Sequence, residues 1–287
     1  MIFCRTLTDA DFPQLYQATL EAFSDYVVPY QPTLDALQRM FVINGVDFGF
    51  SVGAFDGEKI IGFIVNAAGD WAGRRTVYNS GTGVLSDYRK QGISRKMFEF
   101  ALPVLKENKI EQCLLEVVTE NAPAVNLYQN LGFEITRELS VFKKKDLDCA
   151  AEKFKENIRI KEIELPDWEL FESFWTYLPS WQNSTDSIKR SLVDETIVKT
   201  FLGAYLDQTL VGYAVLFHNS GNIPQIAVAE PHRGKNIGCA LLNSLQKRVE
   251  KPLFVPNVDR SAESATAFFA ANRFALLTTQ QEMLLKL

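Results

Sequence analysis

The residues best suited to chemistry lie at an expected strand-to-helix turn, residues 84–96. A helix start exposes unpaired backbone amides and partial positive charge, and a small residue lets the backbone approach an anion closely. The spacing of Arg89, Gly92 and Ser94 therefore fits a nest of amides for a diphosphate, although a solvated helix start has the same composition. The residues of this turn that we select are Val84, Leu85, Arg89, Lys90, Gln91, Gly92, Ile93, Ser94, Arg95 and Lys96.

A second segment with chemical potential runs over residues 115–133. Glu116 alternates with apolar neighbours, as an outward-facing strand residue does, and Asn121 precedes a short helix that carries Tyr128. Taken alone, Tyr128 is equally an ordinary aromatic residue of an amphipathic helix. The segment thus offers a carboxylate, an amide and a phenol without fixing their roles.

Together the two segments resemble the two signatures of the GNAT acetyltransferase superfamily. Arg-x-x-Gly-x-Ser after Val84-Leu85 is similar to the acyl-CoA pyrophosphate loop of that family. The run Asn121…Leu127-Tyr128…Gly132-Phe133 is similar to its second signature, and the resemblance covers essentially residues 1–143. It implies an α/β fold with a mixed sheet, and acetyl-CoA as the co-substrate.

The same resemblance implies roles for individual residues. Tyr128 would protonate the departing thiolate of CoA, Asn121 would contact the CoA arm, and the backbone amides of Val84 and Leu85 would meet the thioester carbonyl and pantetheine. Glu116 lies twelve positions before Tyr128. That spacing is similar to bacterial ribosomal-protein N-terminal acetyltransferases, in which a glutamate acts as base through water. An amine that arrives neutral would need no such base.

The acceptor site is expected between the first two helices and beside a turn at residues 69–74. Aromatic rings together with an acid suit a cationic amine. A small polyamine, an aminoglycoside, an amino acid and a protein N-terminus all remain open as acceptors. The candidate acceptor residues are Asp25, Tyr26, Tyr30, Asp70 and Trp71.

The order of expected elements repeats along the chain, which predicts two tandem domains of the same fold. Arg89 matches Arg233, 144 positions later, and Phe133 matches Phe274, 141 positions later. Two similar offsets at separate landmarks indicate a duplicated domain. We expect a catalytic domain at residues 1–145, a linker at 146–157 and a degenerate copy at 158–287. Strand and helix alternation predicts mixed sheets with helices on both faces.

The second copy has lost most of the chemical residues. Asn236 stands where Gly92 stands in the first copy, and Gly132 corresponds to Arg273. An offset of 141 places Phe269 at the position of Tyr128, Ala262 at that of Asn121, and Asn257 at that of Glu116. A phenylalanine has no proton to donate and an alanine cannot hydrogen-bond through its side chain. The second copy is therefore expected to be structural or regulatory.

Composition excludes several other classes. The 287 residues are 47% hydrophobic and 23% charged with a net charge of −5, which is ordinary for a globular protein and disfavours a nucleic-acid or anionic-membrane partner. Four scattered cysteines and two histidines fit neither a zinc site nor a disulfide framework, so no metal is expected. The early charge of Arg5 and the short apolar runs predict no signal peptide or membrane span, and hence a cytoplasmic protein. We expect it to be a monomer or a homodimer.

These observations favour an N-acetyltransferase that moves an acetyl group from acetyl-CoA to a primary amine by direct attack in a ternary complex. The alternative is an acyl-CoA-binding pseudoenzyme that acts as a sensor or scaffold. Retention of both Tyr128 and Asn121 favours the enzyme.

Overall fold

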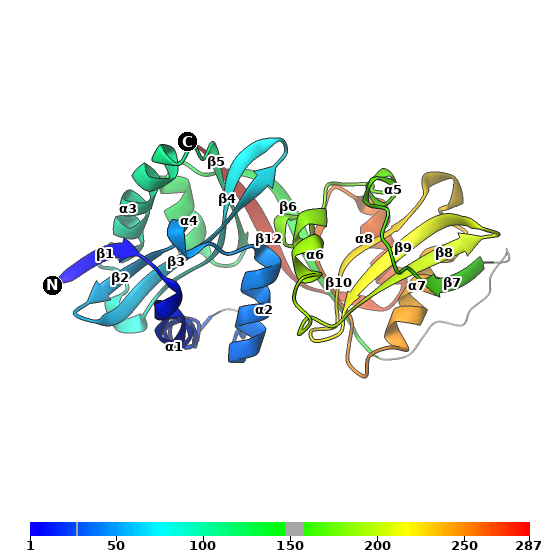
Figure 1. Cartoon of the computed structure of the whole chain (residues 1–287), viewed down its shortest axis with the longest axis horizontal. Helices are drawn as coiled ribbons and strands as arrows, with labels where there is room; N and C mark the ends of the chain where they lie inside the picture. Colours follow the sequence, from blue (N-terminus) through cyan, green and yellow to red (C-terminus); the bar gives the residue numbers. More distant parts are fainter. Residues whose placement is uncertain (27, 147–157) are drawn as a thin grey trace. The chain divides into compact units, whose positions relative to one another are not determined.

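The computed structural model describes residues 1–26, 28–146 and 158–287, and these form two compact units (Figure 1). The first unit comprises residues 1–137 together with 281–287, and the second comprises residues 138–280. The expected linker, apart from Asp146, lies outside the described residues. The expected boundaries at 145 and 158 differ from these units, because each unit also contains a segment from the other half of the sequence.

The sheet of the first unit is ordered β1-β2-β3-β4-β5-β12. Strands β1 to β4 pair antiparallel, whereas β4 and β5 pair in parallel from Thr76 to Asn79. The strands are β1 (Ile2–Thr6), β2 (Val52–Asp56), β3 (Lys59–Trp71), β4 (Arg74–Val84), β5 (Gln112–Val118) and β12 (Phe274–Lys286). The mixed sheet predicted from the sequence is confirmed.

Helices cover both faces of this sheet. A Cβ placed on Gly62 of β3 would meet Ile93 and Met97, which begin the helix of the diphosphate turn. A Cβ on Gly83 of β4 would instead meet Ala22 at the end of the first helix, on the opposite face. The helices are α1 (Phe12–Ala22), α2 (Leu34–Asn44), α3 (Ile93–Glu107) and α4 (Ala122–Asn130).

The second unit repeats this plan, with its strands ordered β6-β11-β10-β9-β8-β7. Its strands are β6 (Glu134–Lys144), β7 (Ile158–Glu162), β8 (Lys199–Leu206), β9 (Thr209–Phe217), β10 (Asn222–Val228) and β11 (Phe254–Asp259). Its helices are α5 (Trp168–Ser173), α6 (Thr185–Ser191), α7 (Ile237–Gln246) and α8 (Glu263–Ala271). The β10–β11 pair is parallel, as the β4–β5 pair is.

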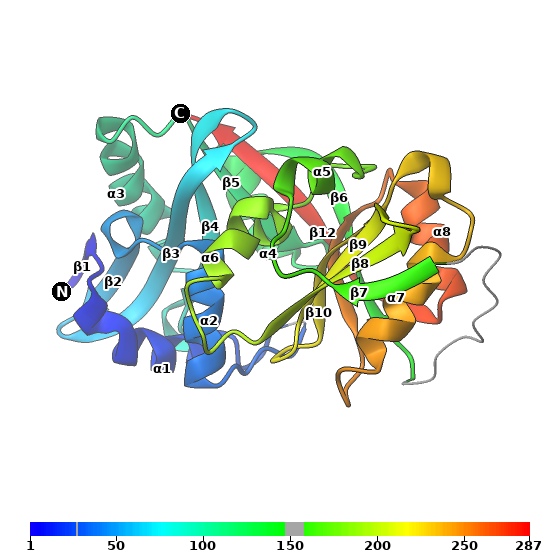
Figure 2. The ribbon, with the colours of Figure 1, turned by 45° about the vertical axis from the view of Figure 1, so that its right-hand side comes forward.

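The two units have exchanged their last strands. The end of β12 lies beside β5, where the Leu287 N–H donates to the Glu111 carbonyl at 2.9 Å (Figures 1 and 2). Met283 of β12 is fully buried in the hydrophobic core of the first unit. Conversely, β6 pairs with β11, and its Phe142 is buried in the core of the second unit. Each core is therefore completed by a strand from the other half of the chain.

Local sequence signals account for most element boundaries of the first half. Thr8 and Asp11 form a capping box before α1, and the hairpin between β2 and β3 turns at Gly57-Glu58, because Asp56 pairs with Lys59. Residues 48–50 form a short 3-10 helix before β2. One expectation was wrong. The turn expected at residues 69–74 is confined to Ala72-Gly73, both with positive φ, because β3 continues through Trp71.

Candidate active site

The first unit contains a cavity of about 600 Å³ between the β4–α3 turn, the start of α4 and the segment after α1. Its lining includes eleven of the residues selected from the sequence, brought together from segments almost 100 positions apart. These are Asp25, Tyr26, Val84, Arg89, Lys90, Gly92, Ile93, Ser94, Arg95, Asn121 and Tyr128. The cavity thus joins the diphosphate turn to the phenol of Tyr128.

The turn has the backbone geometry of an anion nest. Lys90 and Gly92 have φ of 61° and 74°, in the left-handed region, and Gly92 is the N-cap of α3. A Cβ on Gly92 would meet nothing within 4 Å, so its positive φ rather than close packing favours glycine here. The first amides of α3 have no acceptor within the helix, and Ile93, Ser94 and Arg95 line the cavity. An anionic group in the cavity would meet them.

Arg89 joins the turn to the end of α1. Its guanidinium donates to both carboxylate oxygens of Asp25, at 2.6 and 2.8 Å. It also donates to the carbonyls of Ala22, at 2.9 Å, and Val84, at 3.2 Å. The hydrogen bonds from Arg89 lower the pKa of Asp25. Arg89 and Asp25 thus form a salt bridge, and both residues line the cavity.

The edge of β4 at the cavity has one amide directed outward. The Leu85 N–H donates to the Ile61 carbonyl at 2.9 Å, so it is engaged within the sheet and not available to a thioester as the resemblance implied. Successive amides of a strand point to opposite edges, so the Val84 N–H points toward the β5 side. The β4–β5 ladder has already ended there, at Asn79. Val84 is therefore the amide placed to meet a ligand.

Tyr128 lies on α4 with its side chain buried. Its ring packs edge-on against Phe98 and Phe133, at centroid distances of 6.0 and 5.6 Å. Burial raises the pKa of the phenol to about 12. Tyr128 is consequently protonated across the physiological pH range. Thr82 also lines the cavity, and our sequence reading missed it.

Asn121 and Tyr26 both line the cavity. Asn121 is the N-cap of α4, where its side-chain oxygen accepts from the Ala124 N–H at 3.3 Å. Burial raises the pKa of the Tyr26 phenol. A residue that was predicted to hold the cofactor and one that was predicted to hold the acceptor thus line the same cavity.

Glu116 is not among the residues that line the cavity. It lies on β5, where its Oε2 accepts a hydrogen bond of 3.1 Å from the phenol of the buried Tyr78 on β4. This hydrogen bond joins a side chain of β5 to a side chain of β4. A role as base from this position requires an intervening water.

The other expected acceptor residues lie away from the cavity lining. Trp71 is buried at the end of β3, with the Arg137 guanidinium 6.0 Å from its ring. Asp70 faces Arg75 in the β3–β4 ladder. The Tyr30 phenol donates to the Met40 sulfur at 3.4 Å, and burial raises the pKa of that phenol to about 12. Gln91 and Lys96 belong to the turn but are not in the lining.

The second unit repeats the turn without the chemical side chains. Gly234 and Asn236 have φ of 74° and 64°, and Asn236 is the N-cap of α7. Arg233 donates to the carbonyls of Val228, at 2.9 Å, and Phe174, at 3.0 Å, as Arg89 does to Val84 and Ala22. A cavity of about 370 Å³ adjoins this turn, and Phe269 lines it. The duplication predicted from the sequence therefore extends to individual hydrogen bonds.

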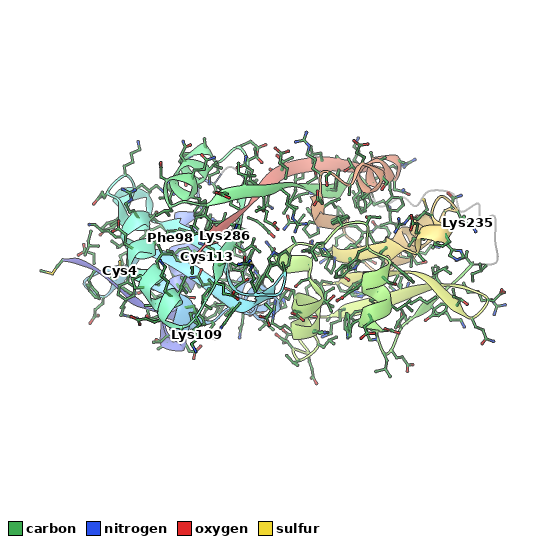
Figure 3. All side chains as sticks on the ribbon, turned by 90° about the horizontal axis from the view of Figure 1, so that it is seen from above. Cys4, Phe98, Lys109, Cys113, Lys235 and Lys286 are labelled. Carbon is green, nitrogen blue, oxygen red and sulfur yellow. The ribbon has the colours of Figure 1, made fainter. Side chains whose placement is uncertain are left out.

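Neither a metal centre nor a membrane span is found in the described parts of the chain. Within residues 1–26, 28–146 and 158–287, no three His, Cys, Asp or Glu side chains are grouped to hold a metal ion. Over the same residues, no helix is long and apolar enough to cross a membrane. Figure 3 labels Cys113 in the first unit, where it belongs to the same hydrophobic core as Phe98, and burial raises the pKa of its thiol to about 12.

Known proteins share both the fold and the sequence motifs. The model of the acetyltransferase (GNAT) family matches residues 12–133 and again residues 159–274. N-alpha-acetyltransferase 30 of Schizosaccharomyces pombe is 30% identical over 125 residues, which cover 43% of this chain and 75% of that protein. An N-alpha-acetyltransferase of Sulfurisphaera tokodaii is 39% identical over 57 residues, covering 20% of this chain and 34% of that protein.

Two solved structures match almost the whole chain. A GCN5-related N-acetyltransferase from Sphaerobacter thermophilus has a TM-score of 0.76 at 16% identity, covering 99% of this chain and 95% of that one. A tandem GNAT protein from the clavulanic acid biosynthesis pathway has a TM-score of 0.73 at 14% identity, covering 100% and 98%. At these identities the likeness establishes the fold. The chain belongs to the acetyltransferase (GNAT) family and contains the domain of that family twice.

Proposed function

We propose that the first unit transfers an acetyl group from acetyl-CoA to a primary amine by direct attack within a ternary complex. The observation that carries this proposal is the single cavity that connects the anion nest at Gly92 to the buried phenol of Tyr128. This cavity would hold the diphosphate of acetyl-CoA at the nest and its thioester near Tyr128. The open amide of Val84 lies between them on the edge of β4.

Acetyl transfer needs a proton donor for the thiolate, a hydrogen-bond donor for the thioester oxygen and a base for the amine, and we assign one group to each. The departing thiolate of CoA receives a proton, and Tyr128, protonated at neutral pH, is the donor. Negative charge develops on the thioester oxygen, and the Val84 N–H is the hydrogen-bond donor directed at it. The attacking amine must be neutral, and Glu116 acts on it through a water molecule, because its carboxylate lies outside the cavity lining.

The acceptor we propose is the α-amino group of a peptide or protein. Two relatives are named N-alpha-acetyltransferases, and the spacing of Glu116 and Tyr128 matches an N-terminal acetyltransferase pattern. Tyr26 offers an aromatic ring and a phenol at the cavity wall. The α-amine also has a pKa near 8, so about a tenth of it is already neutral at pH 7 and the demand on a base is modest.

A panel of acceptors tests this proposal. It contains peptides that differ only in their first residue, the same peptides with a blocked α-amine, and a polyamine, an aminoglycoside and free amino acids. The full chain is assayed by thiol release from acetyl-CoA. We expect turnover with unblocked peptides and loss of turnover on blocking. Turnover with the small amines alone would overturn the peptide assignment, and no turnover with any amine would overturn the transferase.

A second candidate function, binding without transfer, is favoured by one observation in the second unit. The turn at Asn236 retains the nest geometry beside a cavity of about 370 Å³, but Phe269 replaces the proton donor. We therefore infer a non-catalytic site that holds an acyl-CoA. Calorimetric titration of the full chain with acetyl-CoA should find two sites, of which one persists in Gly92→Val. A single site that is lost in Gly92→Val would exclude this candidate.

A further inference from the structure

The guanidinium of Arg89 holds three segments of the first unit together. Its Nε donates to the Val84 carbonyl at the end of β4, at 3.2 Å, and its Nη2 donates to the Ala22 carbonyl at the end of α1, at 2.9 Å. The same guanidinium forms a bidentate salt bridge with Asp25, at 2.6 and 2.8 Å. A bidentate pair fixes orientation as well as distance, because the planar guanidinium matches both carboxylate oxygens. Asp25 is therefore held in one position relative to the β4–α3 turn.

The segment that contains Asp25, residues 23–26, forms one wall of the cavity. Phe23 and Tyr26 line the cavity from this segment, and their rings pack edge-on at a centroid distance of 5.1 Å. The backbone N–H groups of these two residues donate to carbonyls at the end of α1 and just after it. The salt bridge with Arg89 instead connects the segment to the β4–α3 turn. We call Phe23 and Tyr26 the acceptor wall.

The salt bridge is exposed enough that its loss should leave the fold intact. The side chains of Arg89 and Asp25 are 36% and 59% exposed. Exposed ion pairs contribute little to stability, because water solvates both partners once they separate. In a variant of Asp25, Arg89 would keep its hydrogen bonds to the Val84 and Ala22 carbonyls. Such a variant therefore leaves the turn in place and removes its salt bridge to the wall segment.

The second unit has the arginine without the carboxylate. Arg233 donates to the Phe174 carbonyl, the counterpart of the Ala22 carbonyl. Asp25 lies three positions after Ala22. The residue at the same place after Phe174 is Tyr177, which has no carboxylate. The turn is thus built with the carbonyl contacts alone, and of the two units the one with the proposed proton donor also has the salt bridge.

We propose that Asp25 is a positioning residue, whose salt bridge with Arg89 holds the acceptor wall in place beside the bound acetyl-CoA. This inference rests on the proposed function, in which the acceptor enters the same cavity as the thioester. It replaces the direct contact with the amine that the sequence suggested for Asp25, because the positive charge of Arg89 already neutralises this carboxylate. Loss of the carboxylate should weaken acceptor binding more than acetyl-CoA binding.

Steady-state kinetics of Asp25→Asn test this role. The variant keeps the side-chain shape but lacks the charge and one acceptor oxygen. With the fastest peptide of the panel above, the KM for the peptide should rise by about tenfold, equivalent to one hydrogen bond, and the KM for acetyl-CoA should stay nearly unchanged. Asp25→Glu keeps the charge and should restore most of the peptide affinity. The matched control is Glu21→Gln, which weakens the exposed pair with Lys59 at the end of the same helix and should change neither KM.

A double variant separates positioning from general disturbance. In the Arg89→Gln background, at saturating acetyl-CoA, Asp25→Asn should raise the peptide KM no further, because the partner of the carboxylate is gone. An equal rise in both backgrounds would overturn the positioning role. An unchanged peptide KM in Asp25→Asn alone would overturn it as well.

Hydrogen exchange of the full chain supplies a readout that needs no acceptor. Acetyl-CoA should slow exchange of the amides of residues 93–96 in the parent and in Asp25→Asn. It should also slow exchange of residues 23–26 in the parent, and this effect should be much smaller in Asp25→Asn. Equal protection of residues 23–26 in both proteins, or none in the parent, would overturn the positioning role alone. No protection of residues 93–96 in the parent would overturn the proposed function and this inference with it.

Discussion

The guanidinium of Arg137 on β6 donates to both carboxylate oxygens of Glu282 on β12, at 2.9 and 2.7 Å, although 145 positions separate the two residues. Both side chains are largely buried, with 15% and 6% exposed. Thr136 also donates to the same carboxylate, at 2.9 Å. This pair therefore fixes the last strand of the chain onto the first unit.

Removal of one partner should destabilise the protein strongly. Glu282→Ala leaves the Arg137 charge buried without its carboxylate, which typically costs about 3 kcal/mol or more. The matched control is Glu138→Ala, which breaks the neighbouring but exposed pair with Arg260 and should cost about 1 kcal/mol or less. Urea unfolding of both variants measures the difference. Equal losses would mean that the buried pair contributes no more than a surface pair.

The conformation of Gly92 should be required for cofactor binding. At a hundredfold excess over its dissociation constant, a ligand raises the stability of its site by about 2.7 kcal/mol. Gly92→Val forces a β-branched residue into positive φ and should abolish the thermal shift that acetyl-CoA gives to the first unit. Gly57→Val is the control, because Gly57 has φ of 60° and open space around it in a hairpin turn that is not part of the cavity lining. A shift retained by Gly92→Val would remove the turn from the site.

Tyr128→Phe should lower turnover and leave the affinity for acetyl-CoA nearly intact. The change removes one hydroxyl, and general-acid assistance is typically worth about 10²–10⁴-fold. Phe269→Tyr should create no activity in the second unit, where Ala262 and Asn257 stand in place of Asn121 and Glu116. Steady-state CoA release and an acetyl-CoA binding assay measure both effects. Full turnover in Tyr128→Phe, with activity lost in a folded Phe269→Leu, would assign the chemistry to the second unit instead.

The raised pKa of Tyr128 has a direct consequence for the pH profile. The phenol acts in its protonated form, which is lost only as pH rises toward its pKa of about 12. Titration of Tyr128 should therefore cause no decline of kcat between pH 7 and about pH 10. The profile of the parent measures this, with Tyr128→Phe as control. An alkaline decline in that range that vanishes in Tyr128→Phe would contradict the assignment.

Glu116→Gln tests the proposed base. If the carboxylate deprotonates the amine through water, kcat at pH 7 should fall by about tenfold, because about a tenth of an α-amine with a pKa near 8 is neutral there, and should recover at high pH, where the amine is already neutral. Tyr78→Phe removes the hydrogen bond to Glu116 while keeping the ring, and should have a smaller effect. A flat ratio of variant to parent rates from pH 7 to about pH 10 would mean that Glu116 does not act as base.

The fold and the core of the site could be predicted because their signals are local. The turn at Gly92 and the segment around Tyr128 are short runs in which glycine, asparagine and tyrosine have fixed neighbours. The salt bridge between Arg89 and Asp25 could not be predicted, since 64 positions separate the two residues and only tertiary packing brings them together. Thr82 could not be predicted, because a threonine within a strand is ordinary and only tertiary packing places it in the cavity lining.

The exchange of β6 and β12 was missed for a different reason. Both strands follow a short helix at matching positions of the two copies, and each could complete either sheet by its local pattern. Partner choice is settled by tertiary contacts such as Arg137 with Glu282 and the burial of Met283. The placement of Trp71 was likewise misjudged, because the continuation of β3 depends on its pairing with β4 rather than on local turn signals.

The exchanged strand also sets an order on biosynthesis. The core of the first unit requires Met283, so this unit is incomplete until residues 281–287 have left the ribosome, long after residues 1–137 have been translated. A chain that lacks residues 281–287 would still carry Tyr128 and the whole β4–α3 turn, yet it would lack the strand beside β5. Removal of those seven residues should therefore disrupt a candidate site whose residues lie more than 150 positions earlier in the chain.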